Sequence, residues 1–347
     1  MSTIQIGHRT VGPGHPCYVI AEAGSNHNRD FETAKRLIDA AVEAGCDAVK
    51  FQTYSADTLY SKRTPRFTYL AGRDEDTWDI IRKAELPREW QKPLFDYATA
   101  KGIHWLSTPT DRAGVDELDA IGVPAFKISS YEAVDLPFVR YVASKGRPMI
   151  ISTGMCTARE IGDVYGACWD MDNDAVAFLQ CASLYPAPCH IANLRFIPEW
   201  SCTYDGLLGY SDHTLGWHIP LAAVAMGACI IEKHFTLDRT SPGPDHAFAL
   251  EPGELKAMVS QIRDVEAAMG DGDKTGPAPE EQDMYLKARR SVVSACYIPS
   301  GTVITAEMLT SKRPGHGIPA KDITLVVGRV AKADIPEDEV VEWRVLR

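Results

Sequence analysis

Two histidines, His213 and His234, have the spacing expected of a shared metal site. They lie at the ends of the apolar runs GLLGYS and ACIIEKH, 21 residues apart, which is the length of one strand–helix unit. Such spacing places both side chains at the ends of neighbouring parallel strands, around one opening. Two imidazoles with water suit a borderline divalent ion that keeps open positions. The sequence therefore predicts a metal site, although two separately hydrogen-bonded histidines would show the same pattern.

Two lysines, Lys50 and Lys127, lie inside further strand-like runs, DAVKFQ and AFKISS. A lysine in an apolar strand is rarely buried without a partner. Together with nearby hydroxyl groups, the two cations predict a site for a compact anion, most naturally a phosphate plus a carboxylate. These hydroxyl groups belong to Thr108, Ser130 and Ser211. The alternative is a structural ion pair of either lysine with Glu22 or Glu132, which are otherwise candidates for acid–base catalysis or hydroxyl binding.

Eight apolar runs between residues 17 and 269 must position these side chains. They are separated by stretches that include helical periodicity, such as residues 31–42, where apolar positions form one face and Gly45 follows. Repeated units of this kind give a parallel sheet, and eight of them predict a closed (β/α)8 TIM barrel. The sequence lacks the glycine-rich nucleotide turn that an open sheet would favour. The eight runs are CYVIAE, DAVKFQ, IHWLST, AFKISS, PMIIST, AVAFLQC, GLLGYS and ACIIEKH.

The chain divides into three predicted parts: a barrel domain over residues 1–269, a linker over 270–284 and a small domain over 285–347. The linker, GDGDKTGPAPEEQ, holds Gly, Pro and charges without periodicity. The final 63 residues form short β-like runs that are too few for a large core. Their net charge is positive, whereas that of the preceding residues is negative. Opposite charge favours docking of this part on a barrel, its own or a neighbour's.

The composition excludes some classes of partner. The 347 residues carry a formal net charge of −11, which argues against nucleic acid or an anionic membrane as the main partner. No apolar run approaches the roughly 18 residues of a membrane helix, and the first residues lack the apolar segment of a signal peptide. The nine cysteines form no C-x-x-C pair. We therefore expect free thiols and a cytoplasmic protein.

The motifs, taken together, resemble those of the sialic acid synthase family, which includes the N-acetylneuraminate, legionaminate and pseudaminate synthases. IAEAGSNHN, AVKFQ, STP, KISSYE, SLYPAP, GYSDHTLG, EKHFTLDR and PGPD occur in the order found in that family. The tail, from RSVVSACYIPSGTVITAEML to KRPGHGI and GRV, resembles the family's antifreeze-protein-like SAF domain. The resemblance begins at about residue 17 and reaches the C-terminus. It implies a TIM barrel followed by a small, β-rich SAF domain.

The resemblance implies a transferase that forms a carbon–carbon bond. Phosphoenolpyruvate would condense with an N-acylated six-carbon aldose, N-acetylmannosamine or a related sugar, to give a nine-carbon 2-keto sugar acid and phosphate. His213 and His234 would bind a divalent metal, Mn²⁺ or alternatively Mg²⁺ or Co²⁺, and Glu22 would stabilise the cationic centre or handle the water proton. Phosphoenolpyruvate would be held by Lys50, Thr108, Lys127, Ser130 and Ser211. The sugar hydroxyls would be contacted by Gln52, Glu132, Tyr185 and Asp245.

The resemblance also implies a domain-swapped homodimer, in which each SAF domain caps the partner's barrel. Arg313 would then reach the N-acyl group of the neighbour's substrate. Three positions depart from the family pattern: Ser183 replaces Asn, Tyr131 replaces Gly and Arg29 replaces Gly. Ser183 and Tyr131 lie near the expected substrate mouth, where a tyrosine in place of glycine would fill space. Which aldose fits is therefore left open.

Two other functions fit parts of the sequence. A Schiff-base pyruvate aldolase or lyase on the same barrel would use Lys127 as its nucleophile, but it leaves the two histidines without a role. A non-catalytic protein that binds a sugar acid would keep the pocket without the reaction. Consumption of phosphoenolpyruvate distinguishes the synthase from the sugar-acid-binding protein. Borohydride trapping with pyruvate identifies the aldolase.

Overall fold

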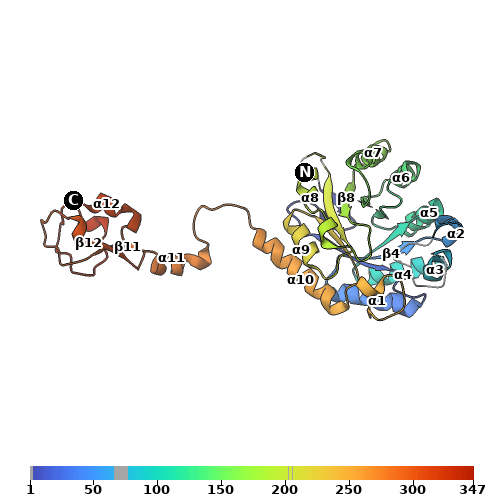
Figure 1. The fold of residues 1–347 in the computed structure, drawn as a ribbon, viewed down its shortest axis with the longest axis horizontal. Coiled ribbons are helices and arrows are strands. Elements are labelled where there is room, and N and C mark those ends of the chain that lie inside the picture. Colours follow the sequence, from blue (N-terminus) through green and yellow to red (C-terminus); the bar gives the residue numbers. More distant parts are fainter. Residues whose placement is uncertain (1–2, 66–76, 202, 205) are drawn as a thin grey trace. The chain divides into compact units, whose positions relative to one another are not determined.

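The computed structural model describes residues 3–65, 77–201, 203–204 and 206–347 of the chain. They form two units, Met1–Gly270 and Asp271–Arg347, which are described separately below. Figure 1 shows the eight-stranded sheet and its surrounding helices in the first unit, and short strands and helices in the second.

Eight parallel strands form the sheet of the first unit. The sheet order is β5-β4-β3-β10-β9-β8-β7-β6, and the edge strands β5 and β6 lie side by side, so the sheet nearly closes on itself. The predicted TIM-barrel class is confirmed, and each strand matches one of the eight predicted runs to within two residues at either end. The strands are β3 (Tyr18–Gly24), β4 (Ala48–Thr53), β5 (His104–Pro109), β6 (Phe126–Ile128), β7 (Met149–Ser152), β8 (Val176–Cys181), β9 (Leu207–Asp212) and β10 (Ile230–His234).

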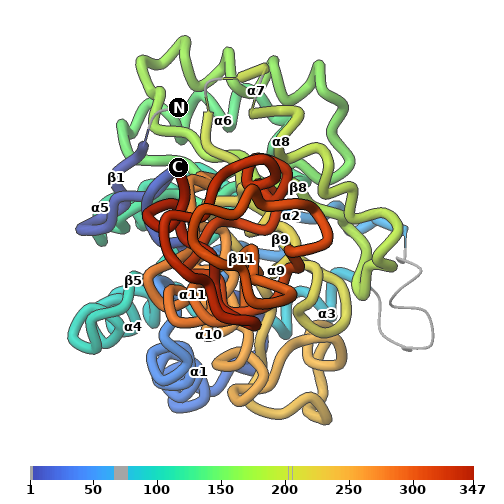
Figure 2. The backbone as a smooth tube through the Cα atoms, turned by 90° about the vertical axis from the view of Figure 1, so that its left-hand side faces the viewer, coloured from blue at the N-terminus to red at the C-terminus, as the bar shows by residue number. Residues whose placement is uncertain are grey.

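Helices follow the strands and cover the outside of the sheet (Figure 1). The first, α1 (Phe31–Ala44), begins where the Asp30 side chain accepts a hydrogen bond from the Thr33 backbone, and it ends at Gly45, whose φ is +81°. The last, α10 (Pro252–Met269), packs against both α1 and α9, which completes the ring of helices (Figures 1 and 2). The others are α2 (Ala56–Leu59), α3 (Thr77–Ala84), α4 (Gln91–Ala100), α5 (Arg112–Ile121), α6 (Leu136–Ala143), α7 (Ala158–Trp169), α8 (Phe196–Ser201) and α9 (His218–Ala225).

Alternation along the strands separates two apolar layers. Outward side chains such as Val49 and Trp105 pack against the helices, whereas inward ones such as Ile20 and Leu106 fill the barrel. A hairpin that the sequence analysis did not predict, β1 (Ile4–Ile6) and β2 (Arg9–Val11), adds its apolar side chains to the inward layer. Two residues further along each strand, the inward position becomes polar. The barrel is therefore an apolar plug below a polar opening.

The second unit is built around an antiparallel pair, β11 (Ser291–Ser294) and β12 (Leu309–Lys312), with a small apolar core. Its helices are α11 (Gln282–Ala288) and α12 (Ile323–Val326). The first of them overlaps the end of the predicted linker and was not predicted. An ion pair between Asp283 and Lys287, one helical turn apart, stabilises it.

Short 3₁₀ turns connect several elements, at Arg88–Trp90, Cys189–Ile191, His246–Phe248, Pro279–Glu281, Ala306–Met308, Ala320–Asp322 and Trp343–Val345. Among the described residues, no helix combines the length and the apolar character needed to cross a membrane. The cysteines that the structure describes are free thiols.

Candidate active site

The polar inward residues line a cavity of about 860 Å³ at the C-terminal ends of the strands. Every predicted site residue of the barrel contributes to its wall. Arg313 belongs to the second unit, just after β12, and its approach to a barrel stays a prediction. The predicted residues at the cavity are Glu22, Lys50, Gln52, Thr108, Lys127, Ser130, Glu132, Ser183, Tyr185, Ser211, His213, His234 and Asp245.

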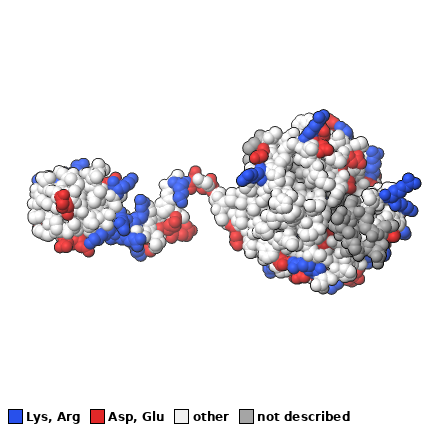
Figure 3. All heavy atoms as spheres, in the orientation of Figure 1, with Lys and Arg blue, Asp and Glu red and all other residues white. Residues whose placement is uncertain are grey.

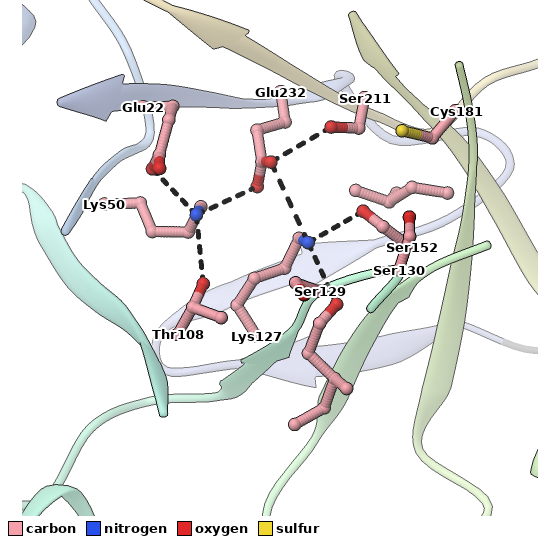
Figure 4. Close-up of polar contacts among 12 residues, drawn as sticks. Glu22, Lys50, Thr108, Lys127, Ser129, Ser130, Ser152, Cys181, Ser211 and Glu232 are labelled. Atoms are coloured by element: carbon pink, nitrogen blue, oxygen red, sulfur yellow. Dashed lines mark hydrogen bonds and ion pairs between the residues drawn. The ribbon is translucent and has the colours of Figure 1, made fainter. Parts of the chain in front are cut away.

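Lys50, on β4, contacts three residues of the buried polar cluster in Figure 4, namely Glu22, Thr108 and Glu232. Its Nζ lies 2.7 Å from Glu22 Oε2 and donates a hydrogen bond of 3.0 Å to Thr108 Oγ1. Glu232 Oε2 lies 3.9 Å away. Burial opposes the charge of Lys50, but the carboxylates of Glu22 and Glu232 raise its pKa. Lys50 is therefore a charged ammonium, and the structural pairing with Glu22 considered from the sequence is present in the barrel.

Lys127, on β6, lies near Glu232, on the side opposite to Lys50. Its Nζ lies 3.8 Å from Glu232 Oε1 and donates to Ser152 Oγ at 2.7 Å. Burial lowers the pKa of Lys127, while Glu232 counteracts this effect. Burial would raise the pKa of Glu232, but Lys127 and Lys50 hold it below its ordinary value. Glu232 also accepts a hydrogen bond from Ser211 Oγ at 3.0 Å.

Glu232 is the main site residue to which the sequence analysis assigned no role. It follows the inward Ile230 of β10 by two positions and precedes His234 by two, so strand alternation places all three on the inner face. The same alternation was available for Ser152 on β7 and Cys181 on β8, which also line the cavity. What the sequence did not reveal is that Glu232 would lie between the two lysines.

Glu22, on β3, has a carboxyl group whose pKa is raised. Burial raises its pKa to about 7, although the Lys50 ammonium lies beside it. Gln52 Nε2 donates a hydrogen bond of 2.8 Å to its other oxygen. A carboxyl group that titrates near neutral pH can both accept and return a proton. This environment supports the acid–base role predicted for Glu22, and it makes Gln52 a group that orients the carboxyl.

The raised pKa of Glu22 gives a prediction for stability. A carboxyl whose folded pKa exceeds its ordinary 4.5 binds its proton more tightly when folded, so its ionisation destabilises the fold as pH rises from 4.5 to about 7. Glu22→Gln removes this ionisation. Urea titrations at pH 4.5 and 7.5 measure the free energy of unfolding of both proteins. The value for the variant minus that for the wild type should therefore be more positive at pH 7.5 than at pH 4.5. An equal difference at both pH values would contradict the raised pKa.

His213 and His234 meet at one side of the cavity, with ring centroids 5.3 Å apart. His213 Nδ1 lies 2.8 Å from the carbonyl oxygen of Ala182, a bond that leaves Nε2 as the free ring nitrogen. Burial lowers the pKa of His234 well below its usual range, so its ring is neutral. Its Nδ1 is buried without a hydrogen-bond partner among the described residues, at 3.7 Å from Asp245 Oδ2. Two imidazoles with open nitrogens and a nearby carboxylate are the groups that would hold a divalent ion.

The loop after β7 brings Ser130 and Ser183 together. Ser130 Oγ accepts a hydrogen bond of 2.9 Å from the Gly154 backbone. A Cβ atom at Gly154 would lie 2.3 Å from Ser183 Oγ, so only glycine allows this approach. The two serines, which come from different strands, therefore share one wall of the cavity.

Glu132 and Tyr185 lie on the wall where sugar contacts were predicted. Ser129 Oγ donates to Glu132, and burial raises the pKa of the Glu132 carboxyl. The Tyr185 ring lies 4.3 Å from that of His213 and 6.0 Å from that of His234, measured between centroids. Tyr185 therefore stands directly beside the two histidines.

Two neighbours of the histidines face away from the opening. Lys233 Nζ donates to Asp212 Oδ2 at 2.6 Å, and both side chains have no exposed surface. Thr214 Oγ1 also donates to Asp212, at 3.1 Å. The sequence analysis drew no distinction between these positions and the inward ones at the strand ends. Alternation explains their placement, since each is one residue from an inward histidine.

Comparison with known proteins gives two family matches. The profile of the NeuB family matches residues 37–274, and that of the SAF domain matches residues 289–347. The chain is 38% identical to N,N'-diacetyllegionaminic acid synthase of Legionella pneumophila, over 97% of this chain and 96% of that protein. It is 37% identical to N-acetylneuraminate-9-phosphate synthase of Mus musculus, over 96% and 93%. The crystal structure of N-acetylneuraminic acid synthetase from Leptospira borgpetersenii, in complex with citrate, superposes with a TM-score of 0.73 and 33% identity, covering 82% of this chain and 95% of that one.

Proposed function

The chain belongs to the NeuB family, and we propose that it condenses phosphoenolpyruvate with an N-acylated six-carbon aldose. The products are a nine-carbon 2-keto sugar acid and phosphate. The observation that supports this function best is that one cavity is lined by two buried lysines and two histidines. The lysines suit an anion, and the histidines suit the ion that would activate an aldehyde.

Phosphoenolpyruvate carries two anionic groups, and the floor of the cavity offers two ammonium groups. Lys50 and Lys127 bind these anions, and the hydroxyls of Thr108 and Ser130 donate further hydrogen bonds. Ser211 would donate to the substrate in exchange for its hydrogen bond to Glu232. Glu232 contacts both lysines and thereby fixes the distance between them. Burial of the site strengthens each of these charge interactions, because little water competes for them.

The proposed reaction forms a carbon–carbon bond and then breaks a carbon–oxygen bond. Carbon 3 of phosphoenolpyruvate forms a bond to the aldehyde carbon, and the aldehyde oxygen takes up a proton to become a hydroxyl. This step leaves positive character at carbon 2 of phosphoenolpyruvate. Water adds at carbon 2, and the resulting tetrahedral centre expels phosphate by cleavage of the carbon–oxygen bond. Glu22, whose pKa is about 7, takes the proton of the attacking water. Gln52 holds the Glu22 carboxyl in place during this transfer.

His213 and His234 would hold a divalent ion, Mn²⁺ in the first instance, with Mg²⁺ and Co²⁺ as alternatives. When bound, this ion supplies Lewis-acid polarisation of the aldehyde oxygen. The Ala182 carbonyl orients the His213 ring for this task. Tyr185, beside both rings, excludes water from one side of the pair.

The second unit is proposed to cap the barrel of a partner subunit in a domain-swapped homodimer. Lys and Arg gather around α11 and the start of this unit in the face shown in Figure 3. They include Arg289 and Arg290, which lie near Lys321 around a hollow of about 390 Å³. Residues 285–347 carry a net positive charge and the preceding residues a net negative charge, and opposite charges attract each other.

The capping arrangement gives a prediction for Arg313. Arg313→Ala should raise the KM for the N-acyl sugar about 10-fold or more, with little change in the KM for phosphoenolpyruvate, because Arg313 would contact only the sugar. Steady-state kinetics with each substrate varied in turn measures both values. Arg329→Ala, in the same unit, serves as a control. A larger effect on phosphoenolpyruvate than on the sugar would contradict the capping role.

The proposed function is tested by phosphate release from phosphoenolpyruvate with Mn²⁺ across a panel of hexoses. Release that requires both a sugar and the metal ion is the expected result. Because burial lowers the pKa of Lys127, as a Schiff-base lysine requires, the aldolase remains a second candidate. Borohydride trapping with pyruvate decides between them: a covalent adduct at Lys127 without phosphate release would replace the synthase with the aldolase.

A further inference from the structure

The loop that follows β10 supplies part of the cavity wall. It comprises residues 237–249, and its base is closed where the Thr236 backbone N–H donates a hydrogen bond of 2.8 Å to the Leu250 carbonyl oxygen. Within the loop, Pro244 and Asp245 line the cavity. The position of the Asp245 carboxylate therefore depends on the groups that fix this loop.

The Asp245 carboxylate lies where several polar groups of the cavity converge. Its Oδ2 is 3.7 Å from His234 Nδ1. A Cβ atom at Gly24 would lie 3.1 Å from that same oxygen and 3.5 Å from both Gln52 Nε2 and Glu22 Oε1. Because residue 24 has no side chain, these three groups surround one point of the cavity wall. A carboxylate acceptor and an amide donor at such a point suit a sugar hydroxyl, which can both donate and accept.

The next residue, His246, is 2% exposed and lies outside the set of described residues that line the cavity. Its Nδ1 is 2.7 Å from Thr236 Oγ1, and its Nε2 is 3.3 Å from Asn28 Oδ1. Both ring nitrogens are therefore hydrogen-bonded within the protein. The ring is placed to hold its own loop rather than to bind a ligand.

The hydrogen bonds of His246 join the loop after β10 to the loop after β3, the neighbouring strand in the sheet. Asn26 Nδ2, in the loop after β3, makes a second connection by donating a hydrogen bond of 2.8 Å to the Phe235 carbonyl oxygen. Gly243 packs against the His246 ring so closely that a Cβ atom there would lie 2.5 Å from Cδ2. The ring is thus held by close packing as well as by its hydrogen bonds.

A buried, hydrogen-bonded histidine often has only a structural role, but the place of His246 in its loop argues for more. The base of the loop is closed by backbone contacts of Leu250 with Phe235 and Thr236, and these do not involve the ring. Loss of the ring would therefore loosen the part of the loop that carries Asp245 and leave the strand ends in place. Displacement of a substrate-binding group by about 1 Å can cost up to about 100-fold in rate.

We propose that His246 is a positioning residue for the sugar: by fixing the loop after β10, it keeps the Asp245 carboxylate where it accepts a hydrogen bond from a sugar hydroxyl. The inference rests on the proposed function and adds to it a residue that touches neither substrate. Phosphoenolpyruvate is bound at the two lysines in the proposed function, so His246 acts on the sugar alone.

The test measures phosphate release by the full chain with saturating Mn²⁺, phosphoenolpyruvate and a hexose. The hexose is the one that the wild type uses best in the panel, which includes N-acetylmannosamine. His246→Phe removes both hydrogen bonds and keeps a ring. The KM for the sugar should rise about 10-fold, as expected when a hydrogen bond to a charged group is lost, and kcat and the KM for phosphoenolpyruvate should change less than about 2-fold. His246→Gln, whose amide can take the place of Nε2, should keep most of the sugar affinity.

A double-mutant cycle shows whether His246 acts through Asp245. Asp245→Ala should raise the KM for the sugar at least as much as His246→Phe does. Adding His246→Phe to Asp245→Ala should change that KM by less than about 2-fold, because the carboxylate to be positioned is already absent. A residue that only stabilises the fold would add its full effect in the double variant.

His104→Phe is the matched control, because both ring nitrogens of His104 are also hydrogen-bonded, at 2.7 Å to Tyr18 Oη and 3.0 Å to His8 Nδ1. His104 is the first residue of β5, at the end of the strands opposite to the cavity. Both KM values should equal those of the wild type. Asn28→Gly is a second variant in case His246→Phe fails to fold. It removes one hydrogen bond at a residue whose φ of +48° suits glycine, and it should raise the KM for the sugar about 3-fold.

An unchanged KM for the sugar in His246→Phe and Asn28→Gly, or an equal rise in the KM of both substrates, would overturn the inference and leave the synthase intact. A full additional effect of His246→Phe in the Asp245→Ala background would do the same. Absence of phosphate release by the wild type with every sugar would overturn the proposed function itself and the inference with it.

Discussion

In the His213→Ala variant, phosphate release from phosphoenolpyruvate is expected to fall by about 10³-fold or more, and Mn²⁺ binding by more than about 100-fold. Loss of a residue that merely orients a ligand costs roughly 10- to 100-fold in metal affinity, and loss of the ligand itself costs more. The effect is large because the variant keeps one imidazole, that of His234, where the wild type has two. Calorimetric titration with Mn²⁺ measures the affinity independently of turnover.

His218→Ala is a suitable control, because His218 is exposed and contacts Cys189 rather than the cavity. It should bind Mn²⁺ and turn over as the wild type does. Circular dichroism should show that both variants keep their fold, since removing one ring at a polar opening leaves the apolar layers intact. Full activity in His213→Ala would rule out the metal site at this pair.

Lys233→Met is expected to destabilise the protein by about 3–5 kcal/mol, the cost of leaving one member of a buried ion pair without its partner. The Asp212 carboxylate would stay fully buried, and it would keep the hydrogen bonds from the Thr214 backbone N–H and hydroxyl. The loss is comparable to a large part of the stability of a typical domain, so the variant should unfold at much lower urea concentration. Equilibrium urea unfolding at pH 7 measures the difference.

A matched substitution shows that burial causes this effect. Lys92→Met breaks an ion pair with Asp96 in which both side chains are more than half exposed, and it should cost only about 0.2–1 kcal/mol. The double variant Asp212→Leu, Lys233→Met should recover most of the lost stability, because no charge is left without a partner. Equal costs for Lys233→Met and Lys92→Met would contradict the structure around Asp212.

The sequence by itself determined the class of fold and most of the residues around the cavity. Eight apolar runs predict buried strands, and the helical stripes between them predict a parallel barrel. In such a barrel the strand ends converge, so Lys50, Lys127, His213 and His234 could be assigned to one opening before their distances were known. These features depend on local patterns, which the order of residues records directly.

Only the tertiary structure decided which groups touch across the barrel. Glu232 lies between two lysines that are far from it in the sequence, and this contact depends on how closely the sheet closes. The pKa of Glu22 follows from its burial beside Lys50, and the approach of Tyr185 to the His213 ring follows from two loops that meet at the cavity. Strand alternation states which face a side chain takes, but distance and burial set its charge and its partners, and both arise from the packing of elements that are remote along the chain.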